Sequence, residues 1–348
     1  MLRIEMLPAH HGDCILVEYG DVAAPYRVLI DGGTESSADA VAARLRMIGE
    51  PATLDLLVVT HVDEDHIGGM LKLLAADSNR VAPKDLWFNT YKHLFPPDKL
   101  GGPMAEGFKT VIEKAGFPLN AAFDGKSVVV PDEGPLPELK LMGGATITLV
   151  SPTWDKLKKL RPKWEAECKK AKILPGGGAE PADVLGKHPP PTMIDVDKLL
   201  KVGFRQDPSE ANGSCIAFIF EWGGKRLLLG ADAHPSVVLE SLKRLSPHDP
   251  VPLHGFKVCH HGSRNNTMSE LLDHIECSRF LVSTNGETFG HPDPETLARI
   301  VSRPGNKELC FNYDSEYSRP WSKLSLRQHY RYEVALPDDN AGGLVVEL

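Results

Sequence analysis

The chain has 348 residues, of which 42% are hydrophobic and 25% are charged, and its formal net charge is −8 at pH 7. This composition is typical of a globular protein and excludes a disordered chain, while the negative charge argues against tight nonspecific binding of nucleic-acid phosphates. No apolar run reaches the roughly 18 residues of a membrane helix and the first residues lack the pattern of a secretion signal, so we expect a cytoplasmic protein with no membrane partner.

The first half of the chain is expected to fold into short strands that give way to alternating strands and helices. Apolar and β-branched runs predict strands at 2–7, 14–19, 26–30, 54–60, 81–88, 127–130, 140–142 and 145–150. Apolar residues at helical spacing predict helices at 36–47, 67–76, 107–115 and 153–171. Residues 174–192 contain three consecutive glycines and three consecutive prolines, so we expect a flexible insertion and hypothesise that it closes over the site as a lid.

The second half gives the clearest local signal, a β-hairpin formed by 215–222 and 225–230 around Gly223-Gly224. After it, strands are predicted at 255–258 and 279–282, and helices at 235–245, 269–274 and 294–300. We therefore predict a layered α/β fold in a single domain spanning 1–348, with a C-terminal extension from about 304. Acidic and histidine clusters follow several strands, which predicts one site at the edge of the sheet.

The densest of these clusters is His61-Val62-Asp63-Glu64-Asp65-His66, which directly follows a buried strand. Alternating His61, Asp63 and Asp65 can face one side of a loop, with His66 behind them. Nitrogen and oxygen donors in this density suit two divalent cations. A solvated acidic loop with chance histidines is the alternative, and the density of the cluster favours the ligand loop.

Two further polar groups follow apolar strands. Asp232 would carry a large desolvation cost unless it is paired, and a metal ion is one partner that resolves this cost. The alternative is an N-cap for the helix that begins near Pro235. His260 and His261 also follow an apolar strand, and the three clusters together predict a shared metal site.

These segments resemble a known family. THVDEDHIGG resembles the metallo-β-lactamase fold in its HxDxDHxGG form, which is typical of the nuclease-like domain of the competence DNA-uptake channel protein. CILVEYG…VLIDGG, LLLGADAH, KVCHHGSRNNT, NGSCIAF and GHPDPETL match other parts of that group's pattern in the right order, over roughly residues 1–300. The resemblance implies a four-layer αββα sandwich with a binuclear metal site at the sheet edge, acting as a hydrolase.

The resemblance also implies roles for individual residues. His61 and Asp63 would bind the first ion, Asp65 and His66 the second, and Asp232 would bridge both. Adjacent residues that leave a strand point in opposite directions, so we expect only one ligand from the histidine pair. Related enzymes often have a serine soon after the ligand histidine, which favours His261 as that ligand. The expected catalytic or substrate-contacting residues are His260, Asp65 and His291, and Asp31 would orient a ligand loop by hydrogen bonding.

Three departures from the family pattern bear on these roles. Asp63 stands where a second histidine is usual, which favours Mn²⁺ and leaves Zn²⁺ open. The family's middle histidine has no obvious match, since His93 and His188 both lack a convincing context and we expect His93 at the surface or rim. Ala231 replaces the usual glycine before the bridging aspartate, a small change.

Two divalent ions, Zn or Mn, held roughly 3.5–4 Å apart would activate a metal-bound hydroxide for attack on phosphorus or on a carbonyl. Asp63 or Asp65 would accept a proton from that water. His291 would hold a phosphate oxygen, with a solvent-facing loop histidine as the alternative. Substrate hydrogen bonds are expected from side chains for which a turn or cap role is the alternative, namely Ser263, Asn265, Asn266, Asn212 and Ser214.

The expected function is therefore a metal-dependent, nuclease-like phosphodiesterase whose substrate is a nucleotide or nucleic acid. The alternatives are a hydrolase of carboxylic esters, lactones or amides, and a non-catalytic metal-binding module, which the missing middle histidine suggests. Trp87, Phe88 and Tyr91 are predicted to be core residues, with base stacking as the alternative. No protein partner is indicated.

Overall fold

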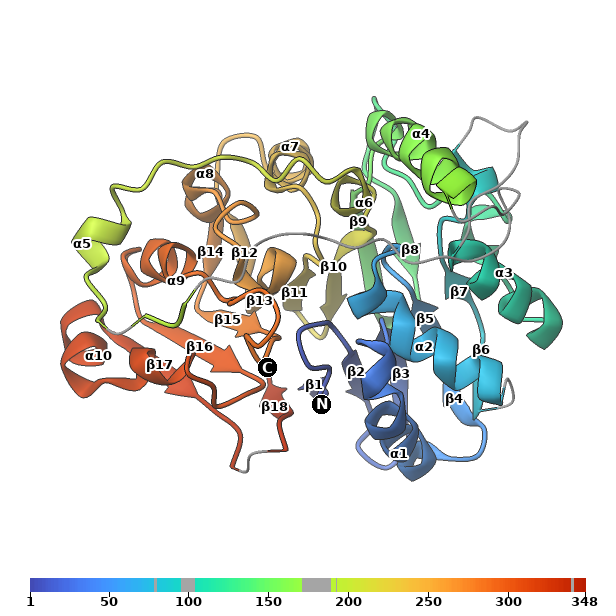
Figure 1. The fold of residues 1–348 in the computed structure, drawn as a ribbon, viewed down its shortest axis with the longest axis horizontal. Coiled ribbons are helices and arrows are strands. Elements are labelled where there is room, and N and C mark those ends of the chain that lie inside the picture. Colours follow the sequence, from blue (N-terminus) through green and yellow to red (C-terminus); the bar gives the residue numbers. More distant parts are fainter. Residues whose placement is uncertain (78–79, 95–103, 171–188, 192, 339–340) are drawn as a thin grey trace.

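The computed structural model describes residues 1–77, 80–94, 104–170, 189–191, 193–338 and 341–348. Within these residues two large sheets pack face to face, and helices cover the outer face of each sheet (Figure 1). The site described below lies at the edge where strands of both sheets end.

The first sheet has six strands in the order β18 (Leu344–Glu347), β1 (Leu2–Met6), β2 (Ile15–Gly20), β3 (Pro25–Ile30), β5 (Leu56–Val58) and β7 (Leu86–Trp87). The pairs from β18 to β3 are antiparallel, and β3, β5 and β7 run parallel. The helices packed on it are α1 (Ala38–Ile48), α2 (Glu64–Ala76), α3 (Met104–Ala115) and α4 (Trp154–Lys170).

The second sheet has eight strands in the order β17 (Tyr332–Ala335), β16 (Lys307–Phe311), β15 (Arg279–Val282), β13 (Gly255–Lys257), β11 (Lys225–Leu229), β10 (Ala217–Trp222), β9 (Thr146–Ser151) and β8 (Glu138–Lys140). From β11 to β17 the strands are parallel. Its helices include α7 (Pro235–Leu245), α8 (Ser269–Asp273), α9 (Pro294–Val301) and α10 (Leu324–Tyr330).

Smaller elements complete the described part of the chain. The two-stranded sheets pair β4 (Ala52–Leu54) with β6 (Val81–Pro83), and β12 (Val251–Leu253) with β14 (Ile275–Cys277). Short helices are α5 (Val196–Leu199), α6 (Glu210–Gly213), η1 (Glu35–Ser37), η3 (Tyr91–Leu94), η4 (Ala121–Phe123), η5 (Met142–Gly144), η6 (Cys259–Gly262) and η7 (Arg319–Ser322).

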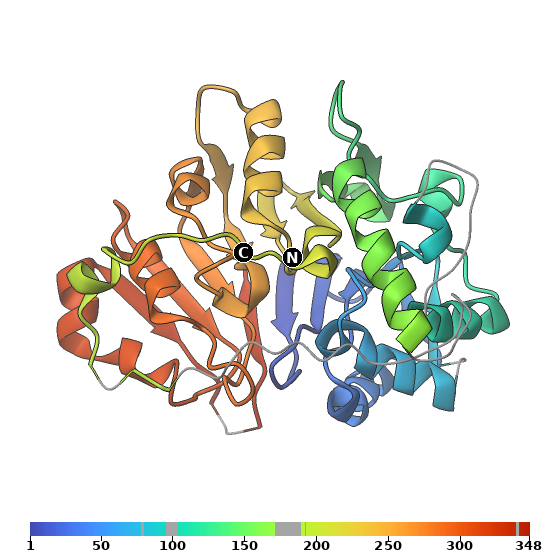
Figure 2. The ribbon, with the colours of Figure 1, turned by 45° about the horizontal axis from the view of Figure 1, so that its top comes forward.

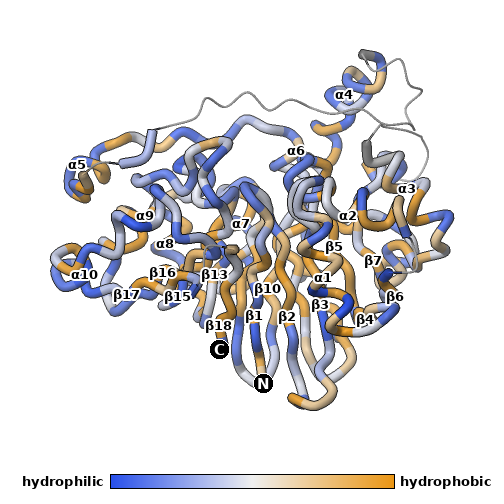
Figure 3. Tube along the Cα trace, turned by 60° about the horizontal axis from the view of Figure 1, so that its bottom comes forward, coloured by the Kyte–Doolittle hydropathy of each residue, from blue (hydrophilic) through white to orange (hydrophobic). Residues whose placement is uncertain are grey.

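Three apolar clusters separate the four layers. One lies between the sheets and includes Val17, Val28, Phe218 and Leu227. A second fills the space under α1 and α2, and a third the space under α7 and α9. In Figure 3 the hydrophobic colour accordingly gathers on the central strands, where both faces are buried. The predicted αββα sandwich is confirmed.

Most predicted elements agree with the structure, and the differences are local. The expected strand 54–60 is divided into β4 and β5 at Asp55, whose carboxylate accepts a hydrogen bond from the Arg27 backbone. Helix α2 begins at Glu64 instead of residue 67, so Asp65 and His66 belong to its first turn. The predicted strand 127–130 is reduced to an isolated bridge at Val130. Of the predicted insertion at 174–192, residues 174–188 and 192 lie outside the described residues, as does the hypothesis that it closes as a lid.

The residues after about 304 contribute to both sheets. They supply β16 and β17 to the second sheet, and β18 pairs with β1 at the edge of the first. The two ends of the chain consequently lie side by side, with the Leu348 N–H donating to the Leu2 carbonyl at 3.0 Å (Figures 1 and 2). None of the helices in the described residues is both long and apolar enough to span a bilayer.

Candidate metal centre

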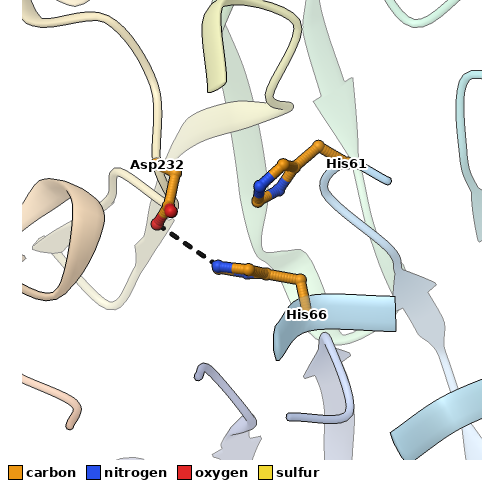
Figure 4. A group of neighbouring side chains, drawn as sticks. All are labelled: His61, His66 and Asp232. Carbon is orange, nitrogen blue, oxygen red and sulfur yellow. Dashed lines mark ion pairs between the residues drawn. The ribbon is translucent and has the colours of Figure 1, made fainter. Parts of the chain in front are cut away.

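The carboxyl ends of four strands bring the predicted site residues together. Asp31 follows β3, the hexad 61–66 follows β5, Asp232 follows β11, and the pair 260–261 follows β13. Figure 4 shows the rings of His61 and His66 directed toward the carboxylate of Asp232, although these side chains come from different sheets. Parallel strands end at a common edge, which is why positions so far apart in sequence meet.

The two histidines of the hexad are fixed by hydrogen bonds on one ring nitrogen each. His66 Nδ1–H donates to Asp31 Oδ2 at 2.8 Å, and His61 Nδ1–H donates to Thr60 Oγ1 at 3.0 Å. Thr60 in turn donates both its hydroxyl and its backbone N–H to Asp31, at 2.8 and 2.7 Å. Because Nδ1 makes this hydrogen bond in both rings, each Nε2 faces the site and is available to a cation.

Asp232 joins the two sheets at this point. Its Oδ1 lies 3.3 Å from His66 Nε2 and 3.6 Å from His261 Nε2, and its Oδ2 lies 3.6 Å from His260 Nε2. The carboxylate is therefore within direct reach of the hexad. The alternative of a helix cap does not hold, because α7 has His234 at its N-cap position.

The histidine pair departs from the sequence expectation. Residues 260 and 261 do not leave β13 as extended strand but form a turn with consecutive left-handed φ angles of +48° and +52°. The expectation that the two side chains diverge is therefore wrong, because both rings face Asp232. His261 also lies 3.3 Å from Asp65 Oδ2, and its Nδ1–H donates to the Ser283 carbonyl at 2.8 Å.

The donors at the centre fit divalent metal ions. The Nε2 atoms of His61, His66 and His261 and the Oδ1 atom of Asp232 are buried and have no hydrogen-bond partner. One donor atom each from His61, His66 and Asp232 lie within 4.8 Å of one another. The same holds for donor atoms of Asp65, His66 and His261. Buried polar atoms without partners are costly, and bound divalent cations would satisfy these atoms.

The electrostatics of the site point the same way. Burial alone lowers the pKa of His66, but the carboxylates of Asp232, Asp65 and Asp31 outweigh burial and raise this pKa well above 6.5. Burial disfavours the charged form of Asp232, yet the neighbouring histidines hold its pKa well below its usual value. Neighbouring carboxylates also raise the pKa values of His260 and His261 against the effect of burial, and they attract metal cations for the same reason. Asp63 completes this face, with its Oδ2 3.5 Å from His61 Nε2 and its side chain 20% exposed.

Four of the predicted substrate-binding side chains make internal hydrogen bonds. Asn212 and Asn266 donate their amide groups to Asp207 at 2.7 and 3.1 Å. Ser214 donates to the Ala211 carbonyl at 2.7 Å, and Ser263 accepts from the backbone of Asn265 at 3.3 Å. These contacts match the turn and cap alternative, and for Asn265 the structure gives only backbone contacts.

His291 is brought into the site. Its ring is 5.5 Å from that of His260, and the side chain is buried with neither ring nitrogen hydrogen-bonded. Its Nδ1 lies 3.6 Å from Asp293 Oδ1. Burial lowers the pKa of His291, which keeps the ring neutral near pH 7. The alternative of a solvent-facing loop histidine is therefore wrong.

Three polar residues of the site were not predicted from the sequence, namely Asp13, Asp207 and Lys257. Asp13 contacts His261 Nδ1 at 3.4 Å and forms a buried ion pair with Lys257. A signal for Asp13 was present, because the run His-His-Gly-Asp at 10–13 follows the first strand in the same way that the hexad follows its strand. Asp207 and Lys257 have no comparable local signal.

The middle histidine has no counterpart at His93. This side chain is 3% exposed, so the expected surface or rim position is wrong. Thr90 N–H donates to its Nδ1 at 3.0 Å, and its Nε2–H donates to the Gly125 carbonyl at 3.2 Å, which leaves no free ring nitrogen. His188 lies outside the described residues. The aromatic residues Trp87, Phe88 and Tyr91 are buried, which confirms their predicted core role.

Comparison with known proteins extends the sequence resemblance. The pattern of the Metallo-beta-lactamase superfamily matches residues 7–277. No curated protein matches the chain. Similar solved structures include CmlA, a diiron beta-hydroxylase from Streptomyces venezuelae, with 13% identity, a TM-score of 0.42 and coverage of 100% of this chain and 54% of that chain. A metallo-beta-lactamase with a HARLDQ motif from Cronobacter sakazakii has 13% identity, a TM-score of 0.31 and coverage of 71% of both chains.

Proposed function

This chain belongs to the metallo-beta-lactamase superfamily, and from that premise we propose that it is a nuclease-like hydrolase of phosphodiester bonds that uses two divalent metal ions. The observation that carries the proposal is the convergence of three unpartnered imidazole nitrogens on the buried carboxylate of Asp232. His61 and Asp63 would hold one ion, and Asp65, His66 and His261 the other, with Asp232 shared between them.

Two bound cations would lower the pKa of a water molecule and neutralise charge on the attacked group. The protein's own part is to hold the ligands in place: Asp31 and Thr60 fix the rings of His61 and His66, and Ser283 fixes the ring of His261. Asp65, with a side chain 14% exposed, faces both the centre and solvent, so it is positioned to accept a proton from attacking water.

The donor set supports a phosphodiester over a carboxylic ester. Asp63 offers a hard oxygen donor beside His61, and oxygen-rich sites suit Mn²⁺, although Zn²⁺ also binds such mixed sets. Paired ions stabilise both the attacking and the leaving oxygen of an in-line displacement at phosphorus. His291, buried beside His260 with free ring nitrogens, is positioned to hydrogen-bond a substrate oxygen.

The chain's charge of −8 bears on the size of the substrate. A long nucleic acid is held mainly through its phosphates, and a negative protein repels them. A nucleotide or another small phosphodiester carries few phosphates and is less affected. The charge therefore favours a small phosphodiester over a long nucleic acid as the substrate.

The test is a panel of substrates with protein stripped by chelator and reloaded with Mn²⁺ or Zn²⁺. We expect hydrolysis of bis(4-nitrophenyl) phosphate that disappears in Asp65→Asn and persists in Glu240→Gln, which changes an exposed carboxylate of α7 by the same one-atom replacement. Turnover of 4-nitrophenyl esters or lactones alone would identify a carboxylic ester hydrolase. Binding of less than one equivalent of metal, with no turnover, would identify a non-catalytic module.

A further inference from the structure

The proposed first metal site is short of one protein ligand. His61 and Asp63 lie beside it with the shared Asp232, whereas the second site has Asp65, His66 and His261 with the same carboxylate. In the described residues His93 is used elsewhere, with both ring nitrogens hydrogen-bonded. A residue other than His93 is therefore needed as the fourth protein ligand of the first metal site.

His260 lies against the carboxylate oxygen of Asp232 that faces away from His66 and His261. The left-handed turn at 260–261 directs both rings to Asp232, and each ring faces a different oxygen of that carboxylate. His261 Nε2 is 3.6 Å from Oδ1, and His260 Nε2 is 3.6 Å from Oδ2. A carboxylate shared between two ions would offer one oxygen to each, and His260 and His261 would then serve different ions.

The other ring nitrogen of His260 is held as metal-ligating histidines usually are. Nδ1–H donates to Asn266 Oδ1 at 2.9 Å, and Asp207 Oδ2 lies 3.3 Å away. Asp207 is itself fixed by the amide groups of Asn212 and Asn266 and by the Ser209 backbone N–H at 2.8 Å. A carboxylate behind Nδ1 fixes the tautomer and makes Nε2 a better donor.

We propose that His260 is the ligand that replaces the missing middle histidine at the first metal site, and that Asp207 is its positioning residue. The inference rests on the proposed two-metal site but not on the identity of the substrate. All four histidines then act alike: each donates Nδ1–H to the protein and offers Nε2 to the centre.

Metal binding tests this directly, with Mn²⁺ alone as the probe. Calorimetric titration and elemental analysis of the full chain should give two equivalents for the unmodified protein and one for His260→Ala under the same conditions. Asp207→Asn should keep both ions but weaken one by about 10–100-fold, the usual effect of losing an outer partner. His93→Gln is the matched control, because this buried ring uses both of its nitrogens in hydrogen bonds with Thr90 and Gly125 and its replacement should leave both equivalents in place.

A second measurement needs no variant. In the Co²⁺-loaded protein, proton NMR should show four shifted, exchangeable imidazole N–H signals, one from each ligating histidine. Three such signals, or two equivalents of Mn²⁺ in a folded His260→Ala protein, would overturn the inference. Fewer than two equivalents in the unmodified protein would do the same. Two equivalents without phosphodiester hydrolysis would refute the proposed substrate and leave the ligand assignment intact.

Discussion

Asp13 and Lys257 form an ion pair that is withdrawn from solvent and joins the loop after β1 to the end of β13. The pair thereby connects the two sheets beside the metal centre, where Asp13 Oδ1 is also 3.4 Å from His261 Nδ1. Burial alone lowers the pKa of Lys257, but Asp13 outweighs it and keeps the ammonium group charged.

Removing one member of this pair is expected to be costly. Lys257→Met leaves the Asp13 carboxylate buried without its counter-charge, so the free energy of unfolding should fall by about 3–5 kcal/mol. Lys243→Met, at an exposed position of α7, should change it by less than about 0.5 kcal/mol. Urea denaturation of chelator-treated protein measures both. Adding Asp13→Asn to Lys257→Met should recover part of the loss, and a loss no larger than that of the control would refute the assigned role.

Gly69 in α2 packs against the backbone of the loop that follows β3. A Cβ atom at this position would overlap the carbonyl oxygen of Gly32 and lie 2.8 Å from that of Thr34, whereas a Cβ atom at Gly107 in α3 would meet no atom within 4 Å. Gly69→Ala should therefore lower the free energy of unfolding by about 1–3 kcal/mol or more. Gly107→Ala should raise it by about 0.5–1 kcal/mol, because alanine restricts the unfolded chain. Equal effects in thermal denaturation would contradict this reading.

The sequence predicted those parts of the site whose residues form a short contiguous motif or directly follow a strand. The hexad 61–66 is contiguous and follows a buried strand, so its density and position were enough to identify it. Asp232 and the pair 260–261 follow strands as well, and parallel topology brings strand ends to one edge. The fold followed from the same alternation of elements together with the family resemblance.

What the sequence did not predict depends on tertiary contacts or on backbone conformation. Asp13 meets Lys257 across 244 positions, and no local pattern encodes such a pairing. The orientation of His260 depends on a positive φ at a non-glycine residue, which residue type does not indicate. His93 lies in a segment without clear periodicity, so the sequence did not predict that its ring is buried against the Gly125 carbonyl.

Asp31 is expected to control metal affinity without touching the metal. It accepts hydrogen bonds from Thr60 and from His66 Nδ1, so Asp31→Asn places an amide group against at least one of these donors. Metal affinity should fall by about 10–100-fold. Asp55→Asn is the control, since Asp55 also accepts a backbone hydrogen bond at 2.8 Å but lies at the opposite end of β5. Calorimetric titration with Mn²⁺ should show a change only for Asp31→Asn, although both variants lose stability.

His93 should make the free energy of unfolding depend on pH between about 4 and 6.5. Its ring is neutral and buried, with Nδ1 accepting from the Thr90 backbone and Nε2–H donating to Gly125. Burial, helped by the charge of Lys92, lowers the pKa of His93 from 6.5 to about 4. The unfolded chain therefore binds a proton between these two values while the folded chain does not.

The sign follows from this difference in proton binding. A folded pKa below the unfolded one contributes stability that is complete above about pH 6.5 and is lost as the pH falls toward about 4. Between pH 7 and pH 5 the loss should be about 2 kcal/mol, from the 1.36 kcal/mol that each pKa unit represents. The side chain in His93→Gln cannot titrate. We therefore expect the difference in free energy of unfolding between the unmodified protein and this variant to fall by about 2 kcal/mol from pH 7 to pH 5. The contributions of the other histidines are the same in both proteins and cancel. Urea denaturation of chelator-treated protein at the two pH values measures the difference, and a value that stays constant would mean that His93 binds protons equally in the folded and unfolded states.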